Sequence, residues 1–144
     1  MARTKTRPRR VELAETYLRD LADRLCLRDW TIAVESEPAK GKDGDEIYAE
    51  VSTIDGHHAS VALSPWFWKA TPEKQREVCA HELGHLSHHQ FDTVAAQIRA
   101  ACDEPVAAAI TKAMDDAEEH AVQHFARVVG PSLPLPPKFN ARRS

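Results

Sequence analysis

Two histidines four residues apart, His81 and His85, enclose a glutamate in the segment HELGH. Residues four apart on a helix leave the same face, so both imidazoles can reach one cation. Glu82 follows the first histidine and can reach a water molecule beside the metal without being a ligand. This is the HExxH pattern, in which two histidines bind zinc and the glutamate is the general base. The segment therefore predicts one zinc ion per chain, with Glu82 as the catalytic base.

The residues around the motif favour this interpretation over a chance match on a histidine-rich surface helix. Apolar residues at Val78, Leu83 and Leu86 can bury one side of the helix. Gly84 stands inside the motif, although glycine costs about 1 kcal/mol relative to alanine in a helix interior. A glycine at this position indicates that another segment passes close to the helix, or that a local defect is tolerated.

The helix that must carry the motif has a recognisable start. Thr71 is a good N-cap and Pro72 suits the first helical position, which predicts a helix from Pro72 to about Gln90. Alternating and β-branched runs before it predict three short strands. These strands are expected at residues 30–35, 47–54 and 59–64, with a turn at Asp55-Gly56 before the third.

Helical periodicity predicts three further helices. They are expected from Val11 to about Arg28, from Asp92 to at least Ala101, and from about Pro105 to Val129. Strands grouped before helices predict an α+β domain with a small, mainly antiparallel sheet. We place this single domain at residues 11–130, between a disordered basic tail at 1–10 and a proline-rich tail at 131–144.

The motif and the order of the elements resemble the zincin metallopeptidases. The resemblance covers roughly residues 30–129, but HELGH is the only specific motif within that range. It implies a minimal zincin-like fold, hydrolysis of peptide bonds and a protein or peptide substrate. It also implies that an edge strand of the sheet, here residues 59–64, pairs with the extended substrate. Small HExxH proteins of this kind are met in bacteria and their phages.

A catalytic zinc usually has three protein ligands, so a third ligand must be found. The metzincin extension HExxHxxGxxH fails, because His88 occupies the glycine position and Phe91 the last histidine position. His88 also lies seven residues from His81, about 10.5 Å along a straight helix, which is too far to share one ion. We therefore expect His88 and His89 to form the frayed, solvated end of the helix, or to place favourable charges near its C-terminus.

The gluzincin branch of the family takes its third ligand from a glutamate on a later helix, and two candidates are available. Glu118 falls on the apolar stripe of the last helix. Burying an unpaired carboxylate there is energetically unfavourable, so this side chain needs a cation. The family's usual offset from the next large apolar residue instead favours Glu119. Both remain candidates, with a slight preference for Glu119.

Asp115 or Asp116 can orient a ligand histidine through a hydrogen bond to its second ring nitrogen. No residue is assigned as the donor that stabilises the transition state.

Composition limits the remaining possibilities. The net charge is -3, and the three cysteines, Cys26, Cys79 and Cys102, form no CxxC pair. They are expected to be buried free thiols of a reducing compartment. No run reaches the length of a membrane span and no apolar segment follows the basic start, so a cytoplasmic protein is expected. Two alternatives stay open: a zinc-binding module without catalysis, and a nucleic-acid-associated protein that uses its basic tails.

Overall fold

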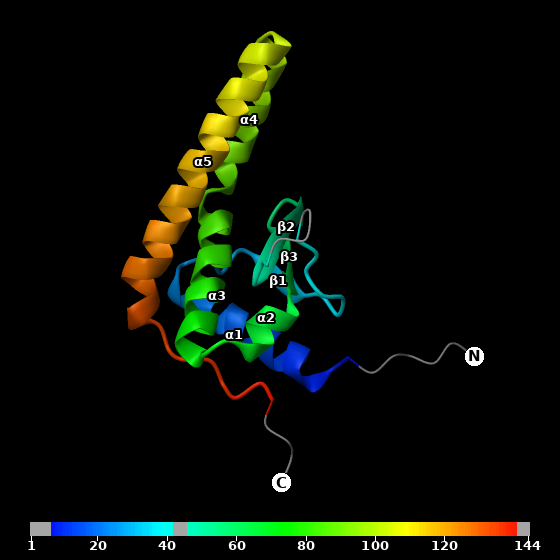
Figure 1. Cartoon of the computed structure of the whole chain (residues 1–144), viewed down its shortest axis with the longest axis vertical. Coiled ribbons are helices and arrows are strands. Elements are labelled where there is room, and N and C mark those ends of the chain that lie inside the picture. Colours follow the sequence, from blue (N-terminus) through cyan, green and yellow to red (C-terminus); the bar gives the residue numbers. More distant parts are fainter. Residues whose placement is uncertain (1–6, 42–45, 141–144) are drawn as a thin grey trace, which may run out of the picture.

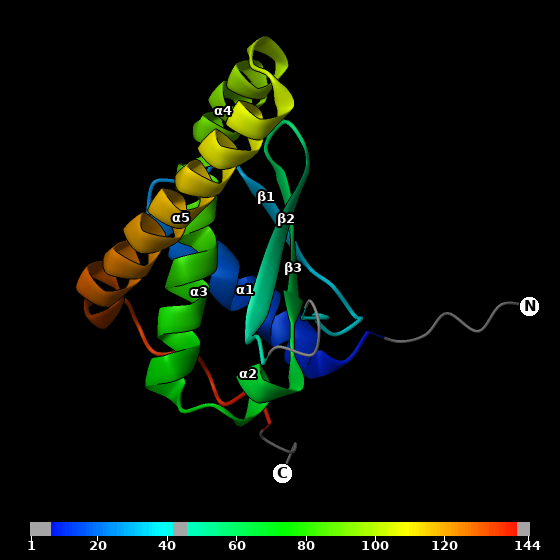
Figure 2. The same cartoon turned by 45° about the horizontal axis from the view of Figure 1, so that its top comes forward.

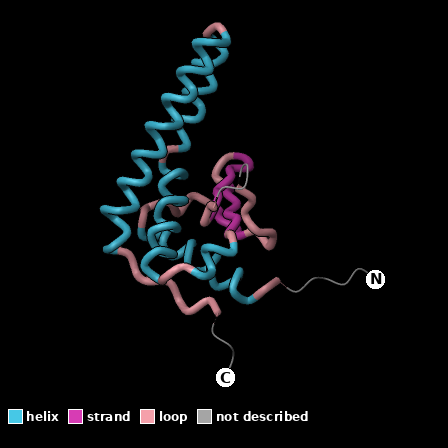
Figure 3. Tube along the Cα trace, in the orientation of Figure 1, coloured by secondary structure: helices cyan, strands magenta, loops and turns pink. Residues whose placement is uncertain are grey.

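The computed structural model describes residues 7–41 and 46–140, which form an α+β domain, as predicted (Figures 1 and 3). The elements follow the expected order of one helix, three strands and then helices. They are α1 (Arg9–Arg24), β1 (Thr31–Val34), β2 (Ala49–Asp55), β3 (His58–Leu63), α2 (Pro65–Lys69), α3 (Pro72–Ser87), α4 (His89–Ala101), α5 (Glu104–Val129) and the 3₁₀ turn η2 (Gly130–Ser132).

The sheet has the order β1-β3-β2, so β3 is its central strand. It pairs antiparallel with β2 and parallel with β1, which makes the sheet mixed rather than mainly antiparallel. The prediction that residues 59–64 form an edge strand was wrong. Ala59 to Leu63 are all buried, as expected of a strand paired on both sides, whereas most of β2 is exposed. The strand with a free edge beside α3 is β2.

The core lies between the sheet, α1 and α3, and its largest fully buried side chains include Leu18, Leu21, Ile32 and Phe67. Figure 2 shows α3 running between α5 and the sheet. Because α3 is covered on both sides, its HExxH segment lies on a firmly packed helix. In the described ranges, no helix is long and apolar enough to cross a lipid bilayer.

The first helix begins at Arg9, so the last two residues of the predicted basic tail belong to α1. Arg7 also contacts the domain, through an ion pair with Glu15. Residues 1–6 and 141–144, which carry Arg3, Lys5, Arg142 and Arg143 of the predicted basic tails, lie outside the described residues. The helix ends before the predicted Arg28, because Cys26 adopts a left-handed conformation with φ of 60°.

The three cysteines are free but not equally buried. Cys79 is buried, as predicted, and Cys102 is half-buried. Cys26 is exposed, so the prediction of burial was wrong for this residue. Its apolar sequence neighbours pack inward, while the turn that ends α1 points Cys26 out to solvent.

The start of the motif helix is confirmed. Thr71 Oγ1 accepts a hydrogen bond from the backbone amide of Lys74 at 3.2 Å, and Pro72 is the first helical residue. The end differs from the prediction, because α3 stops at Ser87 and α4 starts two residues later. His88 and His89 form this junction instead of a frayed end. His88 Nδ1 donates to the carbonyl oxygen of Gly84 at 2.8 Å, and the His89 ring packs against Trp30.

The fourth and fifth helices form an antiparallel hairpin that projects from the body of the domain, as Figure 1 shows. Ala95 and Ala107 are buried where the two helices meet. The second half of α5 leaves this arm and runs back along α3. This return brings a distant part of the sequence to the face of α3 that carries the two motif histidines.

The C-terminal segment packs against the domain as far as Asn140 instead of forming a separate tail from residue 131. Leu133 and Phe139 are buried in the core. The Tyr17 hydroxyl donates to the carbonyl oxygen of Pro134 at 2.7 Å, and the Arg76 guanidinium donates to that of Leu133 at 3.1 Å. Apolar side chains placed between the prolines thus hold an extended segment that could not fold alone.

Helix α5 passes close to α3 at Gly84, as the glycine in the motif indicated. A Cβ atom at this position would lie 3.2 Å from Cβ and Cγ1 of Val122 on α5. We therefore expect Gly84→Leu to lower the free energy of unfolding by about 1–3 kcal/mol, because the larger side chain forces α3 and α5 apart. Urea denaturation measures this. Gly84→Ala is the matched control, since its better helix propensity offsets a small clash. Unchanged stability of the leucine variant would contradict the tight crossing.

Candidate metal centre

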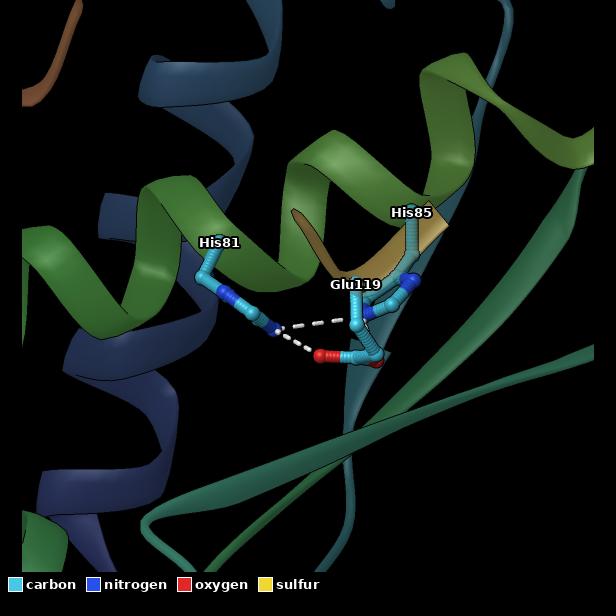
Figure 4. A group of neighbouring side chains, drawn as sticks. All are labelled: His81, His85 and Glu119. Carbon is cyan, nitrogen blue, oxygen red and sulfur yellow. Dashed lines mark hydrogen bonds and ion pairs between the residues drawn. The ribbon is translucent and has the colours of Figure 1, made fainter. Parts of the chain in front are cut away.

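Three side chains from α3 and α5 converge at the crossing of these helices. His81 Nε2 lies 3.2 Å from His85 Nε2 and 3.4 Å from Glu119 Oε2. Glu119 Oε1 lies 3.2 Å from His85 Nε2. Figure 4 shows the three side chains pointing toward one another above the strands. One ligand atom from each lies within 4.8 Å of the others, so the group can hold a metal ion.

The electrostatics of His81 fit a metal ligand. Burial lowers the pKa of this imidazole, and the nearby His85 lowers it further. Both effects favour the neutral ring, which is the form that binds metals. The side chains of His81 and His85 are 19% and 21% exposed. Both rings are therefore mostly shielded by the protein, but a cation can still reach them from solvent.

The two adjacent glutamates of α5 contact different parts of the site. Glu118 Oε1 lies 3.0 Å from His85 Nδ1, on the side of the ring away from the convergence point. This contact places a proton on Nδ1 and leaves Nε2 free to face Glu119. Glu119 thus lies with the two histidines in the group that could hold a metal ion, whereas Glu118 contacts His85 from the other side of its ring. The carboxylate of Glu118, on the apolar stripe of α5, has His85 Nδ1 as its partner.

The prediction that Asp115 or Asp116 orients a ligand histidine was wrong, because Glu118 occupies that position. Asp116 instead pairs with Lys112 at 2.7 Å on the outer face of α5. Asp115 lines a neighbouring pocket. In the sequence, the consecutive glutamates Glu118 and Glu119 were the feature that could have indicated this arrangement. Neighbouring helical residues point about 100° apart, so two of them can approach one histidine from different sides.

The remaining motif residue, Glu82, is almost fully buried, with 7% of its surface exposed. Burial raises the pKa of its carboxyl group to about 7, although the nearby His85 and a backbone hydrogen bond from Val51 act in the opposite direction. Glu82 lines the same cleft as His81 and His85. The site therefore combines possible metal ligands with a separate carboxyl group that is not one of them.

The free edge of β2 forms the opposite wall of this cleft. Ala49, Val51 and Thr53 line it. The Ser64 amide donates to the Tyr48 carbonyl oxygen at 3.0 Å, so Tyr48 faces β3. Because hydrogen-bonding direction alternates along an antiparallel strand, the backbone groups of these three lining residues face away from β3 and toward the cleft. The Val51 amide donates to Glu82, and the remaining backbone groups of this edge can pair with an extended chain.

The remaining histidines of α5 and the two tyrosines do not join this group. His120 and His124 are exposed on α5. The Tyr17 hydroxyl donates to the C-terminal segment, and Tyr17 does not line the cleft. Tyr48 borders a smaller pocket beside His81, with Lys74 Nζ 5.3 Å from the centre of its ring.

Comparison of the chain with family models, curated proteins and solved structures gives no match. The chemistry of the site is therefore inferred from its own residues. Two imidazoles and one carboxylate converge, and a second, buried carboxyl group lies beside them.

Proposed function

We propose that this protein is a small zinc-dependent metallopeptidase of the gluzincin type. The proposal is carried by one observation: α5 brings Glu119 to within hydrogen-bonding distance of both motif histidines, His81 and His85. HExxH alone is a short pattern that occurs by chance. A glutamate arriving 34 residues after His85 at the same point is independent support for a metal centre.

The donor set fits zinc. Two histidines and one glutamate are the protein ligands of several zinc hydrolases, in which the fourth position stays open. A zinc ion held by this group supplies a Lewis acid that polarises a carbonyl group and activates water. Because Glu118 fixes the His85 ring, the ligand nitrogen is already oriented before a metal arrives.

Glu82 is the residue proposed to move the proton. It lines the cleft beside both histidines, so it can accept a proton from an attacking water molecule and deliver it to the leaving amine. The free edge of β2 would hold the substrate in an extended conformation through backbone hydrogen bonds. The substrate is thus a peptide or an extended protein segment. The free cysteines support action in the reducing cytoplasm.

Elemental analysis of the purified protein tests the proposal, with His81→Ala as the matched variant. We expect one zinc ion per chain in the wild type and a loss of zinc in the variant, because a ligand is removed. Cleavage of a proteome-derived peptide library should also stop when a chelator removes the metal. Absence of zinc from a wild-type protein supplied with it would overturn the proposal.

A further inference from the structure

A second pocket opens beside the metal cleft, between α4 and α5. The two cavities share Asp92 and Glu118 as lining residues. Glu118 in turn contacts the ligand His85. A side chain of a polypeptide lying in the cleft can therefore reach this second pocket.

The walls of this pocket are apolar. Phe91, Ala95 and Met114 line it, together with Ala117 and Ala121. The alanines leave open space between the helices, and the cavity measures about 280 Å³. This size suits one long side chain, since pockets for whole small ligands usually start at about 300 Å³.

The polar groups of the pocket are mainly carboxylates. Asp92, Asp115 and Glu118 line it beside the imidazole of His88, and no lysine or arginine among the described residues does. Glu118 is held by His85, and Asp92 contacts His89 Nδ1 at 3.2 Å with 61% of its side chain exposed. Within residues 7–41 and 46–140, no salt bridge to Asp115 is found. The pocket therefore presents negative charge around an apolar interior without a cation of its own.

We propose that this pocket binds a lysine or arginine side chain of the polypeptide that occupies the cleft. A basic side chain has an apolar stem and a cationic head, so the stem can pack on Met114 and Phe91 while the head reaches Asp115. A purely apolar side chain would leave Asp115, for which the described residues supply no ion pair, without a partner. The inference rests on the proposed function, to which it adds the class of substrate, but it is tested by binding.

Met114 provides a reporter inside the pocket, because the chain has only two methionines, Met1 and Met114. The Glu82→Gln protein, labelled with ¹³C-methyl methionine, would be titrated with acetyl-Ala-Ala-Arg-Ala-Ala-amide and with its norleucine analogue. We expect a saturable shift of the Met114 methyl resonance. Affinity for the arginine peptide should be about fivefold higher than for the norleucine peptide, as is typical of an exposed ion pair.

The charge is tested by Asp115→Asn, which should remove the preference for arginine. Asp116→Asn is the matched control, since it changes the same charge one residue away but its carboxylate pairs with Lys112 outside the pocket. Equal binding of the two peptides, no saturable Met114 shift, or a preference that survives Asp115→Asn would overturn the inference.

Peptide cleavage separates this result from the proposed function. If the library is cleaved, we expect lysine or arginine to be enriched at one position by the wild type and not by Asp115→Asn. Enrichment of a basic residue that Asp115→Asn leaves unchanged would also overturn the inference. A protein that shows the Met114 response but cleaves nothing would contradict the proposed peptidase activity and leave the binding of a basic side chain supported.

Discussion

Replacement of Glu82 by glutamine is expected to abolish peptide-bond hydrolysis while leaving the zinc content unchanged. Glutamine has nearly the same shape but cannot accept a proton, and loss of a general base typically lowers the rate by roughly 10²–10⁴-fold. Glu82 is not among the three converging ligands, so metal binding should be retained. Turnover of a library peptide and elemental analysis of the same sample measure the two quantities.

Glu73→Gln is a suitable control for this experiment, because it removes the same charge from the first turn of the same helix at an exposed position. It should cleave like the wild type. Similar cleavage by the Glu82→Gln and wild-type proteins would contradict the role of Glu82. A wild-type protein that binds zinc and cleaves none of the library would favour the alternative of a metal-binding module without catalysis.

Glu119→Ala is expected to weaken zinc binding more than Glu118→Ala does. The first variant removes a ligand, whereas the second removes the partner of His85 Nδ1, a loss that typically lowers metal affinity by about 10–100-fold. Titration of zinc against a competing chelator measures both affinities. The two variants make the same substitution at neighbouring positions of one helix, so each serves as the control for the other.

Glutamine substitutions add a second criterion. Glu118→Gln keeps an oxygen that accepts the His85 Nδ1 proton, so it should recover part of the affinity lost in Glu118→Ala. Glu119→Gln should recover little, because an amide oxygen is a poor replacement for a carboxylate ligand. The reverse order, with Glu118 the more sensitive position, would contradict the assignment of Glu119 as the third ligand.

Local sequence determined the parts of the site that depend on one helix. The spacing of His81 and His85 places both rings on one face through the helical repeat alone. Thr71 and Pro72 specify where that helix starts, since capping depends only on adjacent backbone groups. The alternating runs identified the three strands, because the alternation of side chains along a strand is also a local property. Gly84 signalled a close neighbour without showing that the neighbour is Val122.

The tertiary structure decided what depends on distant segments. Glu118 and Glu119 are neighbours in the sequence, and only the way α5 crosses α3 places Glu119 between the two histidines and Glu118 beside His85 Nδ1. Which strand has the free edge depends on the pairing of β1 with β3, which the spacing of short runs does not specify. The pocket around Met114 likewise exists only because α4 folds back beside α5. The sequence by itself thus determined the spacing of the HExxH motif, while non-local packing brought Glu119 to the two histidines and shaped the cleft around them.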